Sequence, residues 1–264
     1  MKAGETPRLE PMTMGGLLDR AFRLYMENCP LMLGITAAAY VPLYAIQLVM
    51  EAGIGESGAA RHNLTIIFSQ LLFMILWMSL ALPVATGAAT YAISERYLGR
   101  EVTVGQALGR ACRRLWTLTG AQIAVMVRVV IGFLLLLIPG ILWWLSYALV
   151  VPVVLIEGRK AAPSLRRSWE LVKGNRGKVF VVLVVVNALQ WLSTFGVRSV
   201  SGLAVDLESM TGKLLYTAVS DAVVVFLTPL AIVADILLYY DFRIRKEGFD
   251  LEMLSRALAN AKNA

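Results

Sequence analysis

The sequence predicts an all-α membrane protein, a polytopic bundle of six transmembrane helices. Three observations support this prediction: 58% of the 264 residues are hydrophobic, only 16% are charged, and the mean hydropathy is +0.68. A soluble domain carries more charge on its surface, and a disordered chain has far fewer apolar residues. The two cysteines, Cys29 and Cys112, are too few for a disulfide scaffold.

Long apolar stretches define the expected spans. A helix needs about 20 residues to cross a hydrocarbon layer of about 30 Å. We expect spans at 30–50, 64–94, 115–138, 141–157, 178–198 and 214–241. The third and fourth spans are separated at Pro139-Gly140, because proline followed by glycine is typical of a tight turn. The chain is therefore expected to form a single integral membrane domain over 1–264.

Positive charge is distributed unevenly along the chain. With six spans, both termini and the segments 95–114 and 157–178 share one side of the membrane, and 21 of the 25 Lys and Arg residues fall there. Basic segments stay preferentially in the cytoplasm, so both termini are expected to be cytoplasmic. This topology accounts for the net charge of +7, and we expect no nucleic-acid partner.

Three short segments look alike, and each precedes a span. Residues 17–23, 107–113 and 164–170 alternate apolar and basic side chains at helical spacing, as in helices that lie in the headgroup plane. We expect cytoplasmic interfacial helices at 14–27, 103–114 and 161–174, and an amphipathic tail at 249–262. Each interfacial helix would precede a two-span hairpin whose second span contains a proline: Pro83, Pro152 and Pro229. The alternative is that Arg and Leu near the cytoplasmic face reflect no repeat.

Charged residues of these segments have two expected roles. Basic side chains are expected to meet anionic lipid headgroups. They are Arg20, Arg110, Arg113, Arg114, Arg166 and Arg167. Glu157 and Glu170 are expected to form salt bridges that join an interfacial helix to the preceding span.

Ionisable residues inside spans provide the candidate site. Arg128 precedes Pro139 by about ten residues, which places it near the membrane midplane, where an unpaired charge is costly. Asp221 and Asp235 flank Pro229 on the last span. We hypothesise that Arg128 pairs with Asp221 or Asp235. Three uncharged polar residues complete the hypothesised ligand-binding site: Gln122, Asn187 and Gln190.

This hypothesis has two interpretations. In the functional one, the residues line a hydrated or lipid-headgroup cavity in which Arg128 attracts a phosphate or another anion. In the structural one, an ion pair fixes the register of the helices, because pairing satisfies the electrostatics without a ligand.

Four stretches resemble a known membrane domain. They are 138–141, 151–158, 165–175 and 239–250, and include Ile138-Pro139-Gly140-Ile141 and Tyr239-Tyr240-Asp241-Phe242. Over residues 14–258 the chain resembles the membrane domain of some glycerophosphoryl diester phosphodiesterases and related stand-alone bacterial six-span proteins. The resemblance implies a module of the bacterial inner membrane near phospholipid metabolism or envelope maintenance. It does not carry over the phosphodiesterase activity, because the spans leave no room for a catalytic barrel.

The residues needed for catalysis are scarce. A metal hydrolase needs clustered His, Asp and Glu side chains, and His62 is the one histidine of the sequence. We therefore expect no catalytic residue, metal or cofactor, and a non-enzymatic protein that binds lipids or membrane-protein partners in envelope maintenance. The alternative is a transporter, flippase or scramblase of a lipid or small anion. A continuous polar cavity would favour the alternative, and a closed, paired interior the first hypothesis.

Overall fold

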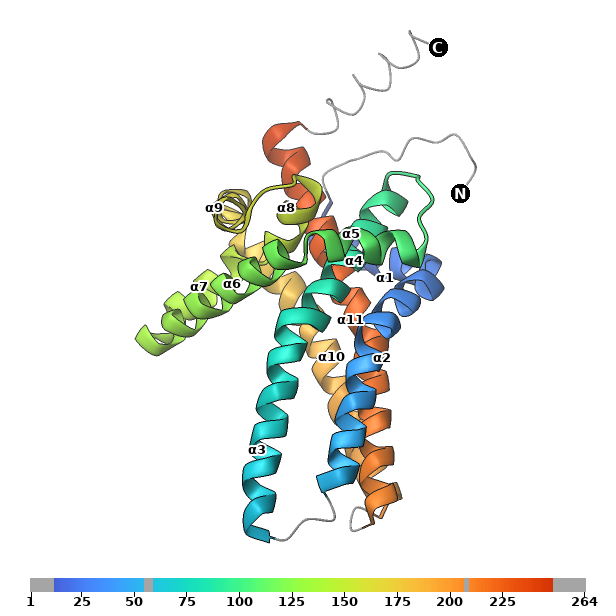
Figure 1. The fold of residues 1–264 in the computed structure, drawn as a ribbon. Helices are drawn as coiled ribbons and strands as arrows, with labels where there is room; N and C mark the ends of the chain where they lie inside the picture. Colours follow the sequence, from blue (N-terminus) through green and yellow to red (C-terminus); the bar gives the residue numbers. More distant parts are fainter. Residues whose placement is uncertain (1–11, 55–58, 207–208, 249–264) are drawn as a thin grey trace.

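The computed structural model describes residues 12–54, 59–206 and 209–248, and these residues form helices with no strand among them (Figure 1). Six helical segments of this described part are long and apolar enough to cross a membrane. The predicted fold class, an all-α helical membrane bundle, is confirmed. The tail expected at 249–262 lies outside the described residues.

The helices follow one another in three similar groups. They are α1 (Met14–Glu27), α2 (Cys29–Ile54), α3 (Ala59–Leu76), the π-helix η1 (Trp77–Ala81) and α4 (Leu82–Tyr97); α5 (Val104–Arg113), α6 (Leu115–Leu135), α7 (Leu137–Ser146) and α8 (Val150–Ile156); and α9 (Ala161–Val172), α10 (Arg176–Ala204) and α11 (Met210–Glu247). Each group begins with a short helix and continues with two long apolar segments.

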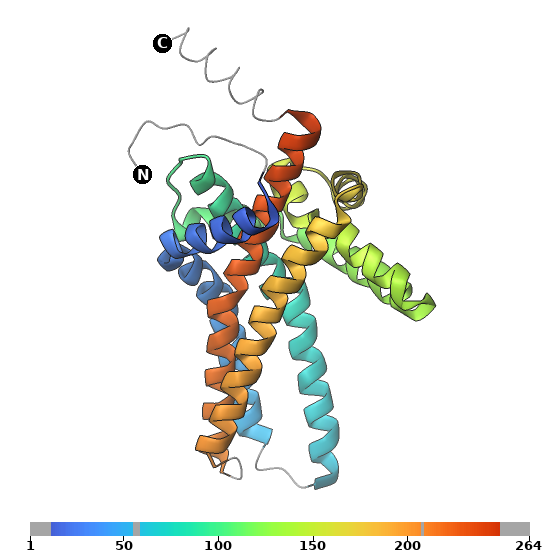
Figure 2. The same cartoon turned by 180° about the vertical axis from the view of Figure 1, so that it is seen from behind.

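The three short helices, α1, α5 and α9, lie across one end of the molecule, at the top of Figures 1 and 2. We call this end the base. The opposite end, where α2 and α10 end and α3 and α11 begin, is called the far end. Local sequence starts these helices: the Thr13 hydroxyl accepts a hydrogen bond from the N–H of Gly16 before α1, and Thr103 and Gln106 form a capping box before α5.

The buried core surrounds the base half of α11. From Val233 to Phe242 nearly every side chain of α11 is buried, and α1, α2, α4, α9 and α10 all pack against this helix. The Tyr240 hydroxyl hydrogen-bonds the Ser94 hydroxyl of α4. In contrast, large apolar side chains toward the far end are exposed, including Leu192, Phe195 and Leu203. The molecule is therefore closed at its base and presents apolar helix faces elsewhere.

Proline affects the three groups differently. Pro83 follows η1, so the expected span 64–94 consists of α3, η1 and α4. A proline that cannot donate its backbone N–H disturbs the regular helical ladder, and π-turns are a common result. The expected span 141–157 is broken at residues 147–149 into α7 and α8, while α11 continues through Pro229.

The turn between α6 and α7 is not at Pro139-Gly140, as the sequence predicted, but at Leu136. Leu136 has an extended backbone (φ −167°, ψ 155°), and Pro139 and Gly140 lie inside α7. Proline is tolerated in the first turn of a helix, where its missing N–H has no helical partner. Gly140 allows close packing, because a Cβ there would lie 2.5 Å from Cγ of Phe133.

The α6–α7 hairpin leaves the bundle. It runs obliquely away from α2, α3, α10 and α11, which extend together toward the far end (Figures 1 and 2). Both ends of the hairpin lie near the base, and its tip lies well short of the level of the far end.

Candidate functional site

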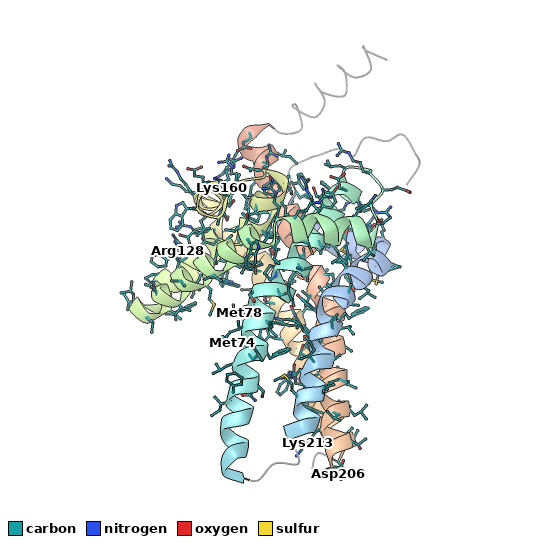
Figure 3. The ribbon with its side chains drawn as sticks, in the orientation of Figure 1. Met74, Met78, Arg128, Lys160, Asp206 and Lys213 are labelled. Carbon is teal, nitrogen blue, oxygen red and sulfur yellow. The ribbon has the colours of Figure 1, made fainter. Side chains whose placement is uncertain are left out.

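Three of the predicted site residues meet at one cavity. Gln122 on α6, Asn187 on α10 and Asp235 on α11 line a cavity of about 420 Å³ between the α6–α7 hairpin and the bundle. This volume falls within the range of small-molecule sites, about 300–1,000 Å³. The apolar wall of the cavity includes Met78, Leu82, Val125, Met126, Trp144 and Ala231. Figure 3 shows Met78 on the bundle, below the hairpin.

The polar groups at this cavity have unused acceptors. Gln122 donates from Nε2 to the Thr86 hydroxyl at 3.0 Å, and Asn187 donates from Nδ2 to the carbonyl of Leu183 at 2.8 Å. The buried atoms Oε1 of Gln122 and Oδ1 of Asp235 have no hydrogen-bond partner within the described part of the chain. A buried acceptor without a donor costs about 1–3 kcal/mol. The cavity is therefore suited to a ligand that brings hydrogen-bond donors.

Arg128 does not belong to this site. Its side chain is exposed, and its Nη1 donates to the carbonyl of Ala124 on the same helix at 2.9 Å. Figure 3 shows Arg128 on the hairpin, well away from α11. The hypothesised ion pair with Asp221 or Asp235 is not formed, because the hairpin turns away from the helix that carries both carboxyl groups.

The other two predicted site residues lie elsewhere. Asp221 lines a second cavity of about 410 Å³, between α2 and α11, together with Tyr44 and Phe226. Gln190 donates from Nε2 to the Thr228 hydroxyl at 3.4 Å. The two aspartates of α11 thus line different cavities, whereas the sequence hypothesis placed them in one site.

Of the two glutamates expected to form salt bridges, Glu157 pairs with a different helix and Glu170 pairs within its own helix. Glu157, after α8, accepts from Nε of Arg167 on α9 at 2.9 Å and from Nε of Arg159 at 2.7 Å. Arg167 also pairs with Glu247 of α11. Burial alone would lower the pKa of Arg167, but its hydrogen bonds to Glu157 and Glu247 and their charges outweigh burial and raise it. Glu170 pairs with Arg166 on its own helix at 2.9 Å, and among the described residues its carboxylate joins no span.

The remaining basic residues predicted to be interfacial lie on or beside the short helices of the base. Arg110 and Arg113 are exposed, and the Arg110 guanidinium lies over the Tyr91 ring, 5.8 Å from its centroid. Arg114 donates to the carbonyl of Gly158 at 2.8 Å. Arg20 is half-buried on α1.

A buried ionic node at the base was missed by sequence reasoning. Asp241 is fully buried on α11 and accepts from Nζ of Lys178 on α10 at 2.6 Å, from Nε of Arg245 at 3.0 Å, and from the N–H of Met12 at 2.7 Å. Lys178 and Arg245 also donate to the carbonyl of Met12. The sequence signal was an aspartate within the apolar run Tyr239-Tyr240-Asp241-Phe242.

Metal-ligating side chains are scattered over the described part of the chain. Across residues 12–54, 59–206 and 209–248, no group of three His, Cys, Asp or Glu side chains is placed to hold a metal ion. The side chain of His62 lies outside the described part.

Comparison with known proteins identifies a family. A family model described as a domain of unknown function, DUF7847, matches residues 17–240, which covers the three groups of helices. No curated protein and no solved structure matches the chain.

Proposed function

The chain belongs to the DUF7847 family, a family of unknown function, and we propose that it is a non-enzymatic integral membrane protein that binds a lipid in the cavity beneath the α6–α7 hairpin. The observation that carries the proposal is the pair of unused acceptors, Oδ1 of Asp235 and Oε1 of Gln122, in a mostly apolar cavity. Ionisable residues inside a membrane protein are costly and usually serve a function.

The chemistry of the cavity defines the class of ligand. Both unused atoms accept hydrogen bonds, and Arg128, which was expected to attract a phosphate, lies outside the cavity. The bound headgroup therefore has hydroxyl or amino groups that donate to Asp235 and Gln122. The apolar wall around Met126 and Trp144 accommodates part of an acyl chain.

Anionic lipids belong to a different part of the molecule in this proposal. The exposed guanidinium groups of Arg110, Arg113 and Arg166 lie at the base. Each contributes about 1 kcal/mol of attraction to an anionic membrane surface. The base would then face the cytoplasm, which agrees with the preference of basic segments for that side. These contacts would orient the protein without selecting one lipid.

The proposed setting is the bacterial inner membrane. It rests on the resemblance of residues 14–258 to membrane domains of glycerophosphoryl diester phosphodiesterases, and an envelope-maintenance role is proposed on the same ground. The family match covers most of this region but adds no function.

Transport of a lipid or small anion is the alternative. It requires one polar path across the bundle, but Asp235 and Asp221 line separate cavities, and Gln190 is hydrogen-bonded to Thr228. This division favours a binding site over a path. Binding of a membrane-protein partner is a further alternative, to which the cavity lends no support.

Native mass spectrometry tests the proposal. Protein extracted gently from its own membrane would be compared with the Asp235→Leu and Gln122→Leu variants, and retained lipids would be identified. We expect one donor-bearing lipid per protein, with occupancy lost about 10-fold in Asp235→Leu, since leaving a buried hydrogen-bonding group without its partner costs about 1–3 kcal/mol. Asp221→Leu is the matched control, because Asp221 lies on the same helix but at the other cavity. Equal lipid retention in all variants would contradict the proposal.

A further inference from the structure

The tip of the α6–α7 hairpin is strongly apolar and exposed. We define the hairpin tip as residues 134–138, Leu-Leu-Leu-Leu-Ile, whose side chains are 64–80% exposed. From residue 129 to 156 the sequence contains no charged side chain. A turn that emerges into water on the far side of a membrane would expose five consecutive large aliphatic side chains there, which is unfavourable.

The turns of the other two hairpins have the opposite composition. The α2–α3 connection and its flanks contain Glu51, Glu56 and Arg61, and the α10–α11 connection contains Asp206 and Glu208. The helix ends that flank these connections lie at the far end, where Asp206 and Lys213 are labelled in Figure 3. The hairpin tip lies well short of that level in both views of the ribbon (Figures 1 and 2).

We infer that the α6–α7 hairpin is re-entrant: it enters the membrane from the base and turns back inside, so that its tip is covered by lipid acyl chains. The length and composition of α6 and of Leu137–Ile156 are sufficient for crossing. Their direction relative to the four long helices, however, keeps the tip from the far side. A re-entrant hairpin replaces two of the six candidate crossings, Leu115–Leu135 and Leu137–Ile156. The number of crossings stays even, so both termini remain on the same side of the membrane.

The backbone of the tip fits an apolar surrounding. Inside a membrane each unsatisfied backbone group is costly, so irregular segments there are short. Leu136 alone separates the two helices, and its N–H donates to the carbonyl of Gly132 at 3.0 Å. Pro139 has no N–H to satisfy in the first turn of α7. Gly132 and Gly140 allow the two helices to touch, because a Cβ on Gly132 would lie 2.9 Å from Cα of Gly140.

Arg128 also agrees with this placement. Its guanidinium donates to Ala124, one turn closer to the start of α6, and Trp116 at that start is 85% exposed. Long basic side chains reach toward the headgroups, where tryptophan is also enriched. On an oblique hairpin, Arg128 lies closer to the base-side headgroups than it would on a helix that crosses directly.

Cysteine accessibility in sealed proteoliposomes tests the inference. In a background with Cys29→Ala and Cys112→Ala, single cysteines would be introduced as Leu136→Cys, Lys160→Cys and Lys213→Cys. Figure 3 shows that Lys160 marks the base and Lys213 the far end. A membrane-impermeant maleimide would be added from either side, and after solubilisation in detergent.

We expect Lys160→Cys and Lys213→Cys to react from opposite sides, and Leu136→Cys to react at least 10-fold more slowly than either from both sides. Detergent should restore its reaction. Labelling of Leu136→Cys from the side of Lys213→Cys would overturn the inference in favour of a full crossing. Labelling from the side of Lys160→Cys would overturn it in favour of a hairpin outside the membrane.

A second measurement, at a different position of the hairpin tip, tests the inference if Leu136→Cys fails to fold. A nitroxide on Ile138→Cys should collide more often with oxygen, which concentrates among acyl chains, than with a water-soluble nickel chelate. A higher collision rate with the nickel chelate would also overturn the inference.

Discussion

The α6–α7 and α10–α11 hairpins differ, although each follows an amphipathic helix and each is made of apolar helices. At the base, α10 and α11 are tied by the ion pair between Lys178 and Asp241, and α11 is surrounded by other helices. Their far-end connection is charged. The α6–α7 hairpin has an uncharged tip and close glycine packing, and it diverges from the bundle.

The difference shows that apolar length does not determine whether a hairpin crosses the membrane. Both hairpins have enough apolar residues to cross a membrane, so hydrophobicity alone does not distinguish them. Polar groups at the two ends of a hairpin do: an ionic node holds one end at the base, and a charged connection draws the other toward water. The α6–α7 hairpin has no charge at its tip, and it borders the cavity instead.

The largest expected effect comes from breaking the anchor of α10–α11. Asp241→Ala leaves Lys178 and Arg245 without their buried carboxylate, and removal of one partner of a buried pair costs about 3–5 kcal/mol. Thermal or denaturant unfolding followed by circular dichroism measures the loss. As a control, Asp19→Ala breaks an exposed pair with Arg23 and should cost less than about 1 kcal/mol. Equal losses would show that the node is no anchor.

A charge placed at the tip should have the next largest effect. Leu136→Arg puts a cation among acyl chains if the hairpin turns inside the membrane, at a cost of up to about 2.5–3.5 kcal/mol. Leu203→Arg, on a still more exposed side chain near the end of α10, should cost little because it can reach far-end headgroups. Unfolding in lipid nanodiscs compares the two. A harmless Leu136→Arg would place the tip in water.

Close packing within α6–α7 should be sensitive to a single methyl group. Gly132→Ala pushes against the backbone of Gly140, and overpacking costs about 1–3 kcal/mol. Gly120→Ala lies on the same helix with open space around it and should instead stabilise the protein, by about 0.5–1 kcal/mol. Unfolding midpoints distinguish the two glycines. Similar shifts would mean that the two helices are not in contact at Gly132.

The smallest effect is expected at Arg128. Because it forms no ion pair within the described residues, Arg128→Ala should change stability by no more than about 0.5 kcal/mol. The same unfolding measurement applies. A loss as large as that of Asp241→Ala would show that Arg128 has a buried charged partner after all.

Sequence reasoning succeeded where the physical signal was local. Apolar length predicted the helical membrane fold, and polar residues inside apolar helices identified three of the residues at the cavity: Gln122, Asn187 and Asp235. It could not supply the direction of a hairpin. Arg128 was paired with Asp221 or Asp235 because of its expected depth in the membrane, but α6 runs obliquely away from the far-end part of the bundle (Figure 1).

Two other differences have similarly specific causes. Pro139-Gly140 carries a turn signal, but the prolyl ring also fits the first turn of a helix, and only the contact of Gly140 with Phe133 distinguishes the two. Asp241 belongs to the base, where Met12, Lys178 and Arg245 surround it from distant parts of the chain. Such long-range pairing leaves no local pattern in the sequence.

The acceptors beneath the hairpin, on Gln122 and Asp235, are proposed to recognise a headgroup that carries hydrogen-bond donors. A matched pair of lipids tests this most directly. Phosphatidylethanolamine and phosphatidylcholine with identical chains have the same net charge, but the ammonium of the former alone has N–H donors. A lipid bound to the native state stabilises it. The unfolding midpoint in nanodiscs should be several degrees higher with phosphatidylethanolamine for the wild-type protein and equal in both lipids for the Asp235→Leu/Gln122→Leu double variant, which lacks both acceptors. Equal midpoints for the wild-type protein, or a difference that persists in the double variant, would contradict the claim.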